Sequence, residues 1–341
     1  MNADGTTRST SFTAAKTNGF YDYGSNNTVN LSTTYRPVYD FEPSTNTNSH
    51  AAHPSADFAD TSANVAAYYY VFNSGLAGCD GTTSDDDCYQ KVTVSSTSGP
   101  GSTDERQNFA NWYSFYRTRS LMTMTAASRA FASVSADSRV AWQALNSCAS
   151  FGTACSGWGG SAVTNKIRKF TGTHRSNFYY WLSRLPASGG TPLLEAMERA
   201  GEYYKTTGVD SPYAYDPGTT DAPEYSCRPN FHVLITDGIW NNNTLANSYG
   251  NYDNTDKTLP DTKSYMARYP YKDTNSANLA DIAFYYWAND LVSTLANNQL
   301  PHYGDRTGTA DQQYWNPKNA PATWQHMVNF TVSLGLNTLL T

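Results

Sequence analysis

Apolar residues in this chain form short blocks separated by long polar stretches. The clearest block is Phe231 to Ile235, which is rich in β-branched residues and too short for a helix. This pattern predicts a buried strand that stops at Thr236-Asp237-Gly238. A second block, Val328 to Leu334, is predicted to be the last strand, with Gly335 at its end. Shorter strands are predicted at Ala66–Phe72, Tyr89–Ser95 and Arg139–Leu145.

Four segments instead show apolar positions at helical spacing. Ser102 and Glu105 fit a capping box at the start of a helix that is predicted to run to about Ser133. Thr191 is predicted to cap a helix that has Pro192 at its first position and runs to about Tyr204. The remaining two helices are predicted at Arg175–Leu185 and at about Ser276–Leu295.

Strands and helices alternate along the second part of the chain, a pattern that predicts a mostly parallel sheet with helices on both faces. The fold class is therefore α/β, with long polar insertions at 205–227, 241–273 and 297–322. We expect one elaborated domain. Residues 1–100, in which no helical periodicity is visible, are predicted to be a β- and loop-rich insertion of the domain whose core is 101–341.

Composition excludes some classes of function. Only 15% of the 341 residues are charged, against about 25% in an average soluble chain, and the net charge is −6. An acidic balance argues against a nucleic-acid partner. No apolar run is long enough to span a membrane. The first residues, MNADGTTRST, lack the apolar segment of a signal peptide, so the chain is either cytosolic or a trimmed portion of an exported protein.

The five cysteines favour export. Cys79 and Cys88 bracket one short polar loop, and Cys148 and Cys155 bracket another, so each pair is predicted to form a local disulfide. Neither pair has the C-x-x-C spacing of a zinc site. Cys227 is left free, or is paired to a residue outside this chain.

Thr191 and Asp237 are the candidate site residues. Thr191 precedes a helix and Asp237 follows a strand, so in a parallel sheet both are expected at the same edge, where ligands gather. Asp237 could equally only begin the turn at Gly238. A hydroxyl and a carboxylate are hard oxygen donors that suit Mg²⁺, Mn²⁺ or Ca²⁺. Two ligands are too few, so further groups are required.

Other polar residues favour structural roles. Asp80 and Asp85–Asp87 do not follow EF-hand spacing and are predicted to form a solvated acidic loop. His50 and His53 are interpreted as surface histidines, and His232 as a hydrogen-bonded histidine within the strand. No metalloprotease, nucleophile-elbow, P-loop or dinucleotide motif is present.

Two loops carry a resemblance to a known domain. SGGTPL at Ser188–Leu193 and LITDG at Leu234–Gly238 resemble the second and third loops of a von Willebrand factor A-like domain. An ordered series of blocks resembles the amino-terminal domain of PilY-type proteins of type IV pilus tips: NFANWYSFYRTRSLMTMTAASRAF (108–131), LPASGGTPLLEAMERAGEYY (185–204), CRPNFHVLITDGIWN (227–241), NLADIAFYYWANDL (278–291) and ATWQHMVNFTVSLGL (322–336).

This resemblance implies a doubly wound sheet with a metal-ion-dependent adhesion site in which Thr191 and Asp237 are ligands. The first metal loop of the family, D-x-S-x-S, is absent, and Asp60–Asn64 mimics it without a preceding strand. We therefore expect the first strand and first metal loop to lie upstream of Met1.

We expect a non-enzymatic module at the pilus tip on the bacterial surface, exported through the periplasm. The resemblance implies roles in pilus biogenesis, adhesion and twitching motility, with minor pilins and a host or abiotic surface ligand as partners. One alternative is a secreted metal-assisted hydrolase that uses Asp237 with His232 or His326. Another alternative is a degenerate, metal-free structural cap of the pilus.

Overall fold

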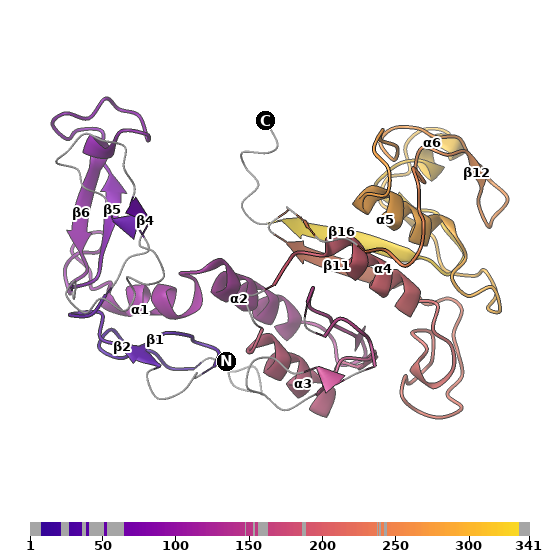
Figure 1. The fold of residues 1–341 in the computed structure, drawn as a ribbon, viewed down its shortest axis with the longest axis horizontal. Helices are drawn as coiled ribbons and strands as arrows, with labels where there is room; N and C mark the ends of the chain where they lie inside the picture. The colour runs from indigo at the N-terminus through magenta and orange to yellow at the C-terminus, as the bar shows by residue number, and fades with distance from the viewer. Residues whose placement is uncertain are drawn as a thin grey trace. The chain divides into compact units, whose positions relative to one another are not determined.

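The computed structural model describes residues 8–21, 27–35, 39–40, 51–52, 65–146, 148–152, 154–155, 163–185, 189–236, 238, 240–241 and 244–333. The chain divides into two compact units, Met1–Ser133 and Val134–Thr341 (Figure 1). Each unit mixes helices with small sheets. The division of the chain into an insertion at 1–100 and a core at 101–341 stays a prediction.

The first unit is built on a hairpin and two helices. Strands β5 (Tyr68–Phe72) and β6 (Tyr89–Thr93), both expected from the sequence, pair antiparallel, and the 3-10 helix η4 (Asp86–Cys88) leads into β6. Two-residue pairs join β1 (Ala15–Lys16) to β2 (Thr28–Val29) and β3 (Tyr39–Asp40) to β4 (Ala51–Ala52). The core of the unit is aromatic and aliphatic, with Leu31, Tyr35, Tyr68 and Tyr113 among its members.

The long helix predicted from Ser102 to Ser133 is two helices, α1 (Arg106–Phe115) and α2 (Arg119–Ala132). The chain breaks because Thr118 adopts an extended conformation and its side chain accepts the N–H of Leu121, which caps α2. The predicted Ser102 capping box is also wrong. Glu105 is the N-cap of α1, and its carboxylate accepts the hydroxyls of Ser98 and Tyr69 instead.

The second unit is centred on a parallel strand pair, β11 (Asn230–Thr236) and β16 (Met327–Ser333). Their register is continuous from Asn230 beside Met327 to Thr236 beside Ser333, and the long connection between them contains α5 (Leu279–Ala288). This is a β-α-β unit. Helix α4 (Leu193–Tyr203) precedes it and packs on α5.

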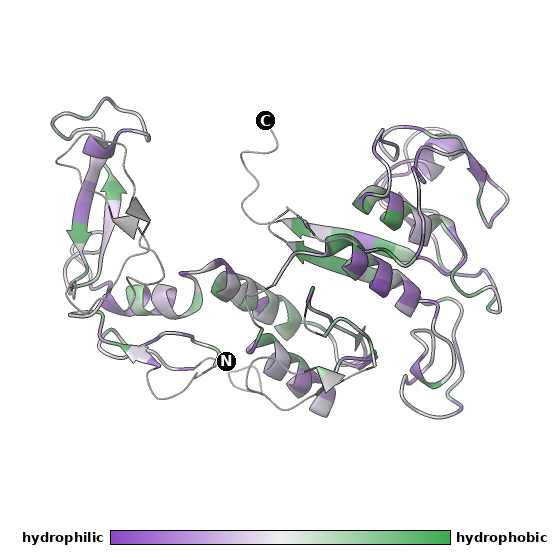
Figure 2. Ribbon diagram, in the orientation of Figure 1, coloured by the Kyte–Doolittle hydropathy of each residue, from purple (hydrophilic) through white to green (hydrophobic). Residues whose placement is uncertain are grey.

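Both helices cover the same face of this strand pair. The main core joins Leu194 and Met197 of α4 to Ile282 of α5, and it includes Leu234 and Met327, whose side chains share one face of β11 and β16. The opposite face carries apolar residues on alternating positions. Figure 2 shows green, hydrophobic positions along β11 and β16 with paler and purple positions between them. Five side chains of that face are 38–55% exposed: Phe231, Val233, Ile235, Phe330 and Val332. Among the described residues of the second unit, the main core cluster lies on the other face.

The remaining strands of the second unit are short. Two-residue strands pair β7 (Arg139–Val140) with β10 (Arg168–Lys169), β8 (Ala154–Cys155) with β9 (Val163–Thr164), β12 (Lys257–Thr258) with β13 (Ser264–Tyr265), and β14 (His302–Tyr303) with β15 (Asn319–Ala320). Helices α3 (Gly172–Leu182) and α6 (Ala310–Tyr314) and the 3-10 helix η5 (Gly208–Asp210) complete the unit.

Several predicted boundaries are wrong. The strand predicted at Arg139–Leu145 is only two residues long, because its partner β10 pairs over two residues. The helix predicted from Ser276 to Leu295 begins at Leu279, where Asn278 caps it, and ends at Ala288. Thr191 does not cap α4, since the N-cap is Pro192 and no side chain caps it.

The predicted doubly wound sheet is wider than any sheet that the described residues form. Every sheet in the described ranges has two strands, and β11 with β16 is the parallel one. A wider parallel sheet covered on both faces stays a prediction. None of the helices described has both the length and the hydrophobicity needed to cross a bilayer.

Candidate functional site

Two loops at the carboxyl end of β11 are joined to each other. The backbone N–H of Thr191 donates to Asn241 Oδ1 at 2.7 Å, and the N–H of Asn241 donates back to the Thr191 carbonyl at 3.1 Å. This reciprocal pair links the start of α4 to the segment that follows the strand, across fifty positions of sequence. The structure thus places Thr191 beside the loop in which the sequence predicts its partner.

Asp237 lies outside the described residues, as do Ser188 and Asp60–Asn64. Its neighbours are described: Thr236 is the last residue of β11, and its hydroxyl accepts the N–H of Gly238 at 3.0 Å. The fit of a cation to this edge therefore rests on donor chemistry. A threonine hydroxyl and an aspartate carboxylate are both hard oxygen donors, which suit Mg²⁺, Mn²⁺ or Ca²⁺.

A pocket of about 920 Å³ adjoins this edge. Its apolar lining includes Leu194 at the start of α4 and Trp240, and its polar lining comes from Asp273 and the residues just before α5. Trp240 is 41% exposed. An aromatic surface beside a few fixed polar groups can hold a small part of a partner molecule.

His232 and His326 do not lie at this edge. His232 is within β11, four residues before Thr236, and Nδ1 of its ring is 2.9 Å from Asn329 Oδ1. Four residues of strand span about 13 Å, beyond the reach of a general base. His326 precedes β16, at the opposite end of the strand pair, and its Nδ1 contacts the Trp324 carbonyl at 2.7 Å. Burial lowers the pKa of both histidines. The geometry gives the hydrolase alternative no support.

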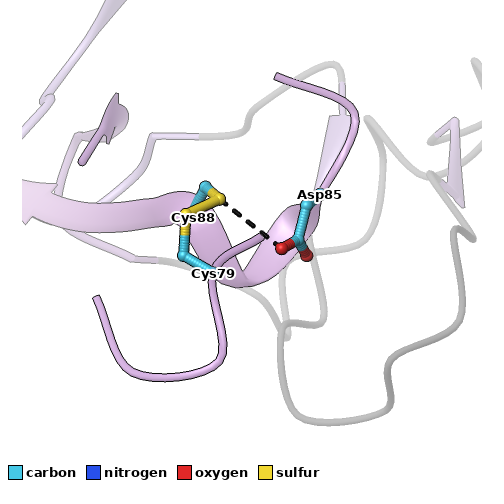
Figure 3. Close-up of side chains that lie close together, drawn as sticks. All are labelled: Cys79, Asp85 and Cys88. Atoms are coloured by element: carbon cyan, nitrogen blue, oxygen red, sulfur yellow. Dashed lines mark hydrogen bonds between the residues drawn. A yellow bond between two sulfur atoms is a disulfide. The ribbon is translucent and has the colours of Figure 1, made fainter. Parts of the chain in front are cut away.

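The acidic loop of the first unit brings three potential metal-ligating atoms together. Figure 3 shows Cys79, Asp85 and Cys88, whose ligand atoms lie within 4.8 Å of one another. The two sulfurs are joined in a disulfide, so neither is a thiolate ligand. Asp85 Oδ2 lies 3.5 Å from Cys88 Sγ and accepts the N–H of Asp80 at 2.7 Å. This carboxylate therefore organises its own loop.

The second predicted cysteine pair is also joined, between Cys148 and Cys155. Cys227 is exposed and forms no disulfide with the other cysteines.

Sequence reasoning missed Asn241 and Trp240. Both lie within five positions of the end of β11, and their signal is the run of polar and aromatic residues after Gly238. That signal could have singled them out, because the residues after a parallel strand line the ligand-binding edge of the sheet.

The chain is similar to a segment of three longer proteins. It is 47% identical over 335 residues to the type IV pilus biogenesis factor PilY1 of Pseudomonas aeruginosa strain PAK. It is 46% identical over 334 residues to PilY1 of strain PAO1, and 40% over 332 residues to PilY1 of strain UCBPP-PA14. Each alignment covers 97% of this chain but only 26% of the relative, so the chain spans about a quarter of their length. No family model matches the chain. No solved structure matches it either.

Proposed function

We propose that this chain is a module of a type IV pilus protein that acts in pilus biogenesis and in attachment to surfaces. The observation that carries the proposal is the similarity, along 97% of the chain, to proteins named type IV pilus biogenesis factors. Two disulfides suit the extracellular or periplasmic side of the membrane, where a pilus tip is exposed. The module acts there without catalysis, in adhesion and twitching motility, with minor pilins and a surface ligand as partners.

The attachment site in this proposal is the edge that follows β11. The β-α-β unit and the hydrogen bonds between Thr191 and Asn241 support a von Willebrand A-like arrangement of this edge. Thr191 and Asp237 would hold a divalent cation there, together with oxygen donors beyond these two. When bound, the cation offers one coordination position to a carboxylate or other oxygen group of the partner. The adjoining pocket with Trp240 selects which partner fits.

The test is made in the full-length protein in bacteria. Asp237→Ala and Thr191→Ala are compared with two matched controls on exposed positions, Asp137→Ala and Thr219→Ala. Surface pili, attachment and twitching zones are measured with added Mg²⁺, Mn²⁺ or Ca²⁺ and with a chelator. We expect Asp237→Ala to attach about tenfold less and to lose the metal dependence, since loss of a charged ligand costs more than about 1.4 kcal/mol of binding. Thr191→Ala removes a neutral ligand and should lose less.

Two outcomes would contradict the proposal at different levels. Attachment that is normal in Asp237→Ala and insensitive to metal and chelator in every variant would overturn the cation-dependent adhesion site and leave a metal-free pilus cap. Normal pilus numbers, attachment and twitching after deletion of the whole module would overturn the role in biogenesis as well.

A further inference from the structure

The loop that precedes β12 wraps around the first turn of α5. Asp281 is fully buried and makes the capping box of α5 with Asn278. The same carboxylate reaches into the loop, because its Oδ1 accepts the N–H of Tyr252 at 2.6 Å and the N–H of Asp253 at 3.2 Å. The loop backbone is therefore held in place by protein hydrogen bonds.

Two side chains of this loop, by contrast, have buried oxygens without a hydrogen-bond partner. Asp253 is 0% exposed, and neither oxygen of its carboxylate accepts a hydrogen bond. Among the residues that the structure describes, it is the one carboxylate with both oxygens buried and unpartnered. Asn251 Oδ1, two positions earlier, is also buried without a partner. A buried charge without a partner is strongly unfavourable, so this pair of groups needs an explanation.

The surrounding charges do not explain how the buried Asp253 carboxylate is stabilised. Burial raises the pKa of Asp253, and the charges of Asp281 and Asp273 raise it further, while the charge of Lys257 and the nearby N–H of Asp273 lower it. That N–H does not reach hydrogen-bonding geometry with either carboxylate oxygen. Lys257 does not donate to this carboxylate. Its ammonium donates to the carbonyl oxygens of Tyr252 and, at 2.7 Å, of Thr255. Negative charge is thus in excess around a buried carboxylate.

The oxygen donors follow the spacing of a cation loop. Asn251, Asp253 and Thr255 alternate with other residues, as do the first three ligand positions of calcium loops. Two backbone carbonyls of the loop already converge on one positive group, the Lys257 ammonium. The neighbouring carboxylates of Asp273 and Asp281 already accept hydrogen bonds from protein groups, so the proposed ligands do not include them. The side-chain donors without a protein partner are one carboxylate and one amide oxygen, and both are hard oxygen ligands.

We propose that the loop Asn251–Asp256 binds a divalent cation of the calcium type through the Asp253 carboxylate and the Asn251 side-chain oxygen. Water completes the shell. The bound cation locks the loop onto the start of α5. This site uses different residues from the Thr191 edge and does not depend on the proposed function.

The test compares melting temperatures of the 341-residue chain with Ca²⁺, with Mg²⁺ and with a chelator. The variants are Asp253→Asn and a matched control, Asp256→Asn, which makes the same change at an exposed position of the same loop. With chelator, Asp253→Asn should melt at the same temperature as the parent chain or higher, because it removes an unpaired buried charge. With Ca²⁺ at one hundred times the dissociation constant, the parent and Asp256→Asn should gain about 5–10 °C and Asp253→Asn should gain none.

The order of stability of the two chains should therefore invert when Ca²⁺ is added. An equal gain in the parent and in Asp253→Asn would overturn the site, and so would no gain in the parent. A less stable Asp253→Asn chain in chelator would show that the carboxylate already has a protein partner. Asp237→Ala should keep the full gain, which separates this site from the one proposed at the end of β11.

Discussion

The two units of the chain differ in how many hydrogen bonds a single carboxylate accepts. In the second unit, the carboxylate of Glu198 on α4 is 5% exposed and accepts four hydrogen bonds from the loop at 246–249. In the first unit, the comparable carboxylate is Glu105, which is half-buried and accepts two hydroxyls. The second unit therefore depends more heavily on single side chains, and it should be the more sensitive of the two to point changes.

Glu198→Ala is the largest expected effect. The change leaves the N–H groups of Ala246 and Asn247 and the Tyr249 hydroxyl without their acceptor, so we expect it to destabilise the second unit by about 3 kcal/mol. Glu105→Ala removes the acceptor of two hydroxyls but no capping hydrogen bond, and should cost the first unit about 1 kcal/mol. Urea unfolding followed by hydrogen exchange reports each unit separately. Equal losses in the two variants would contradict the comparison.

The next prediction compares two glycines, one in each unit, that each lie against an aromatic ring. A Cβ on Gly201 in α4 would lie 2.4 Å from the Tyr286 ring, and a Cβ on Gly19 would lie 2.2 Å from the Phe115 ring. Tyr286 cannot move aside, because it is fully buried and its hydroxyl bonds to Tyr249 and Glu202. Phe115 is only half-buried and can shift.

We therefore expect Gly201→Ala to destabilise the second unit by about 2 kcal/mol, after the small gain in helix propensity. Gly19→Ala should cost the first unit less than about 1 kcal/mol. The same unfolding measurement checks both values. A larger loss for Gly19→Ala would mean that the first unit is the more tightly packed.

Local patterns explain which parts of the structure could be predicted from sequence. The strand at Phe231–Ile235, the hairpin strands and both short disulfides depend on residues near one another in the chain, and all are present. Caps were harder. Thr118 lies within a continuous apolar stripe, and the stripe concealed the break between α1 and α2.

Contacts between distant segments could not be predicted. Thr191 was expected at the end of β11, but its bonds to Asn241 join two loops that share no pattern in the sequence. Burial of the Asp253 carboxylate depends on α5, twenty-eight positions later, so the sequence shows Asp253 only as one polar residue of the insertion at 241–273. A buried polar group without a partner is visible only after folding.

The smallest expected effect is the pH dependence of stability that comes from the histidines of the second unit. Burial lowers the pKa of His174, His232 and His326, all in the second unit. His174 Nε2 donates to the Val140 carbonyl at 2.8 Å, while its Nδ1 is buried without a partner and has no acceptor for a second proton. Because the folded pKa lies below the unfolded value of about 6.5, the unfolded state takes up protons first as the pH falls. The stability contributed by the neutral rings is complete above pH 6.5 and is lost below it.

We therefore expect the second unit to lose stability as the pH is lowered from 7.5 to 5.5. No histidine lies in the described part of the first unit, which should change little over this range. Hydrogen exchange at matched intrinsic rates would measure both units in one sample. His174→Gln should flatten the pH response of the second unit, whereas His302→Gln, at an exposed position, should leave it unchanged. A pH response of equal size in both units would show that carboxylates, which are common to both, govern it.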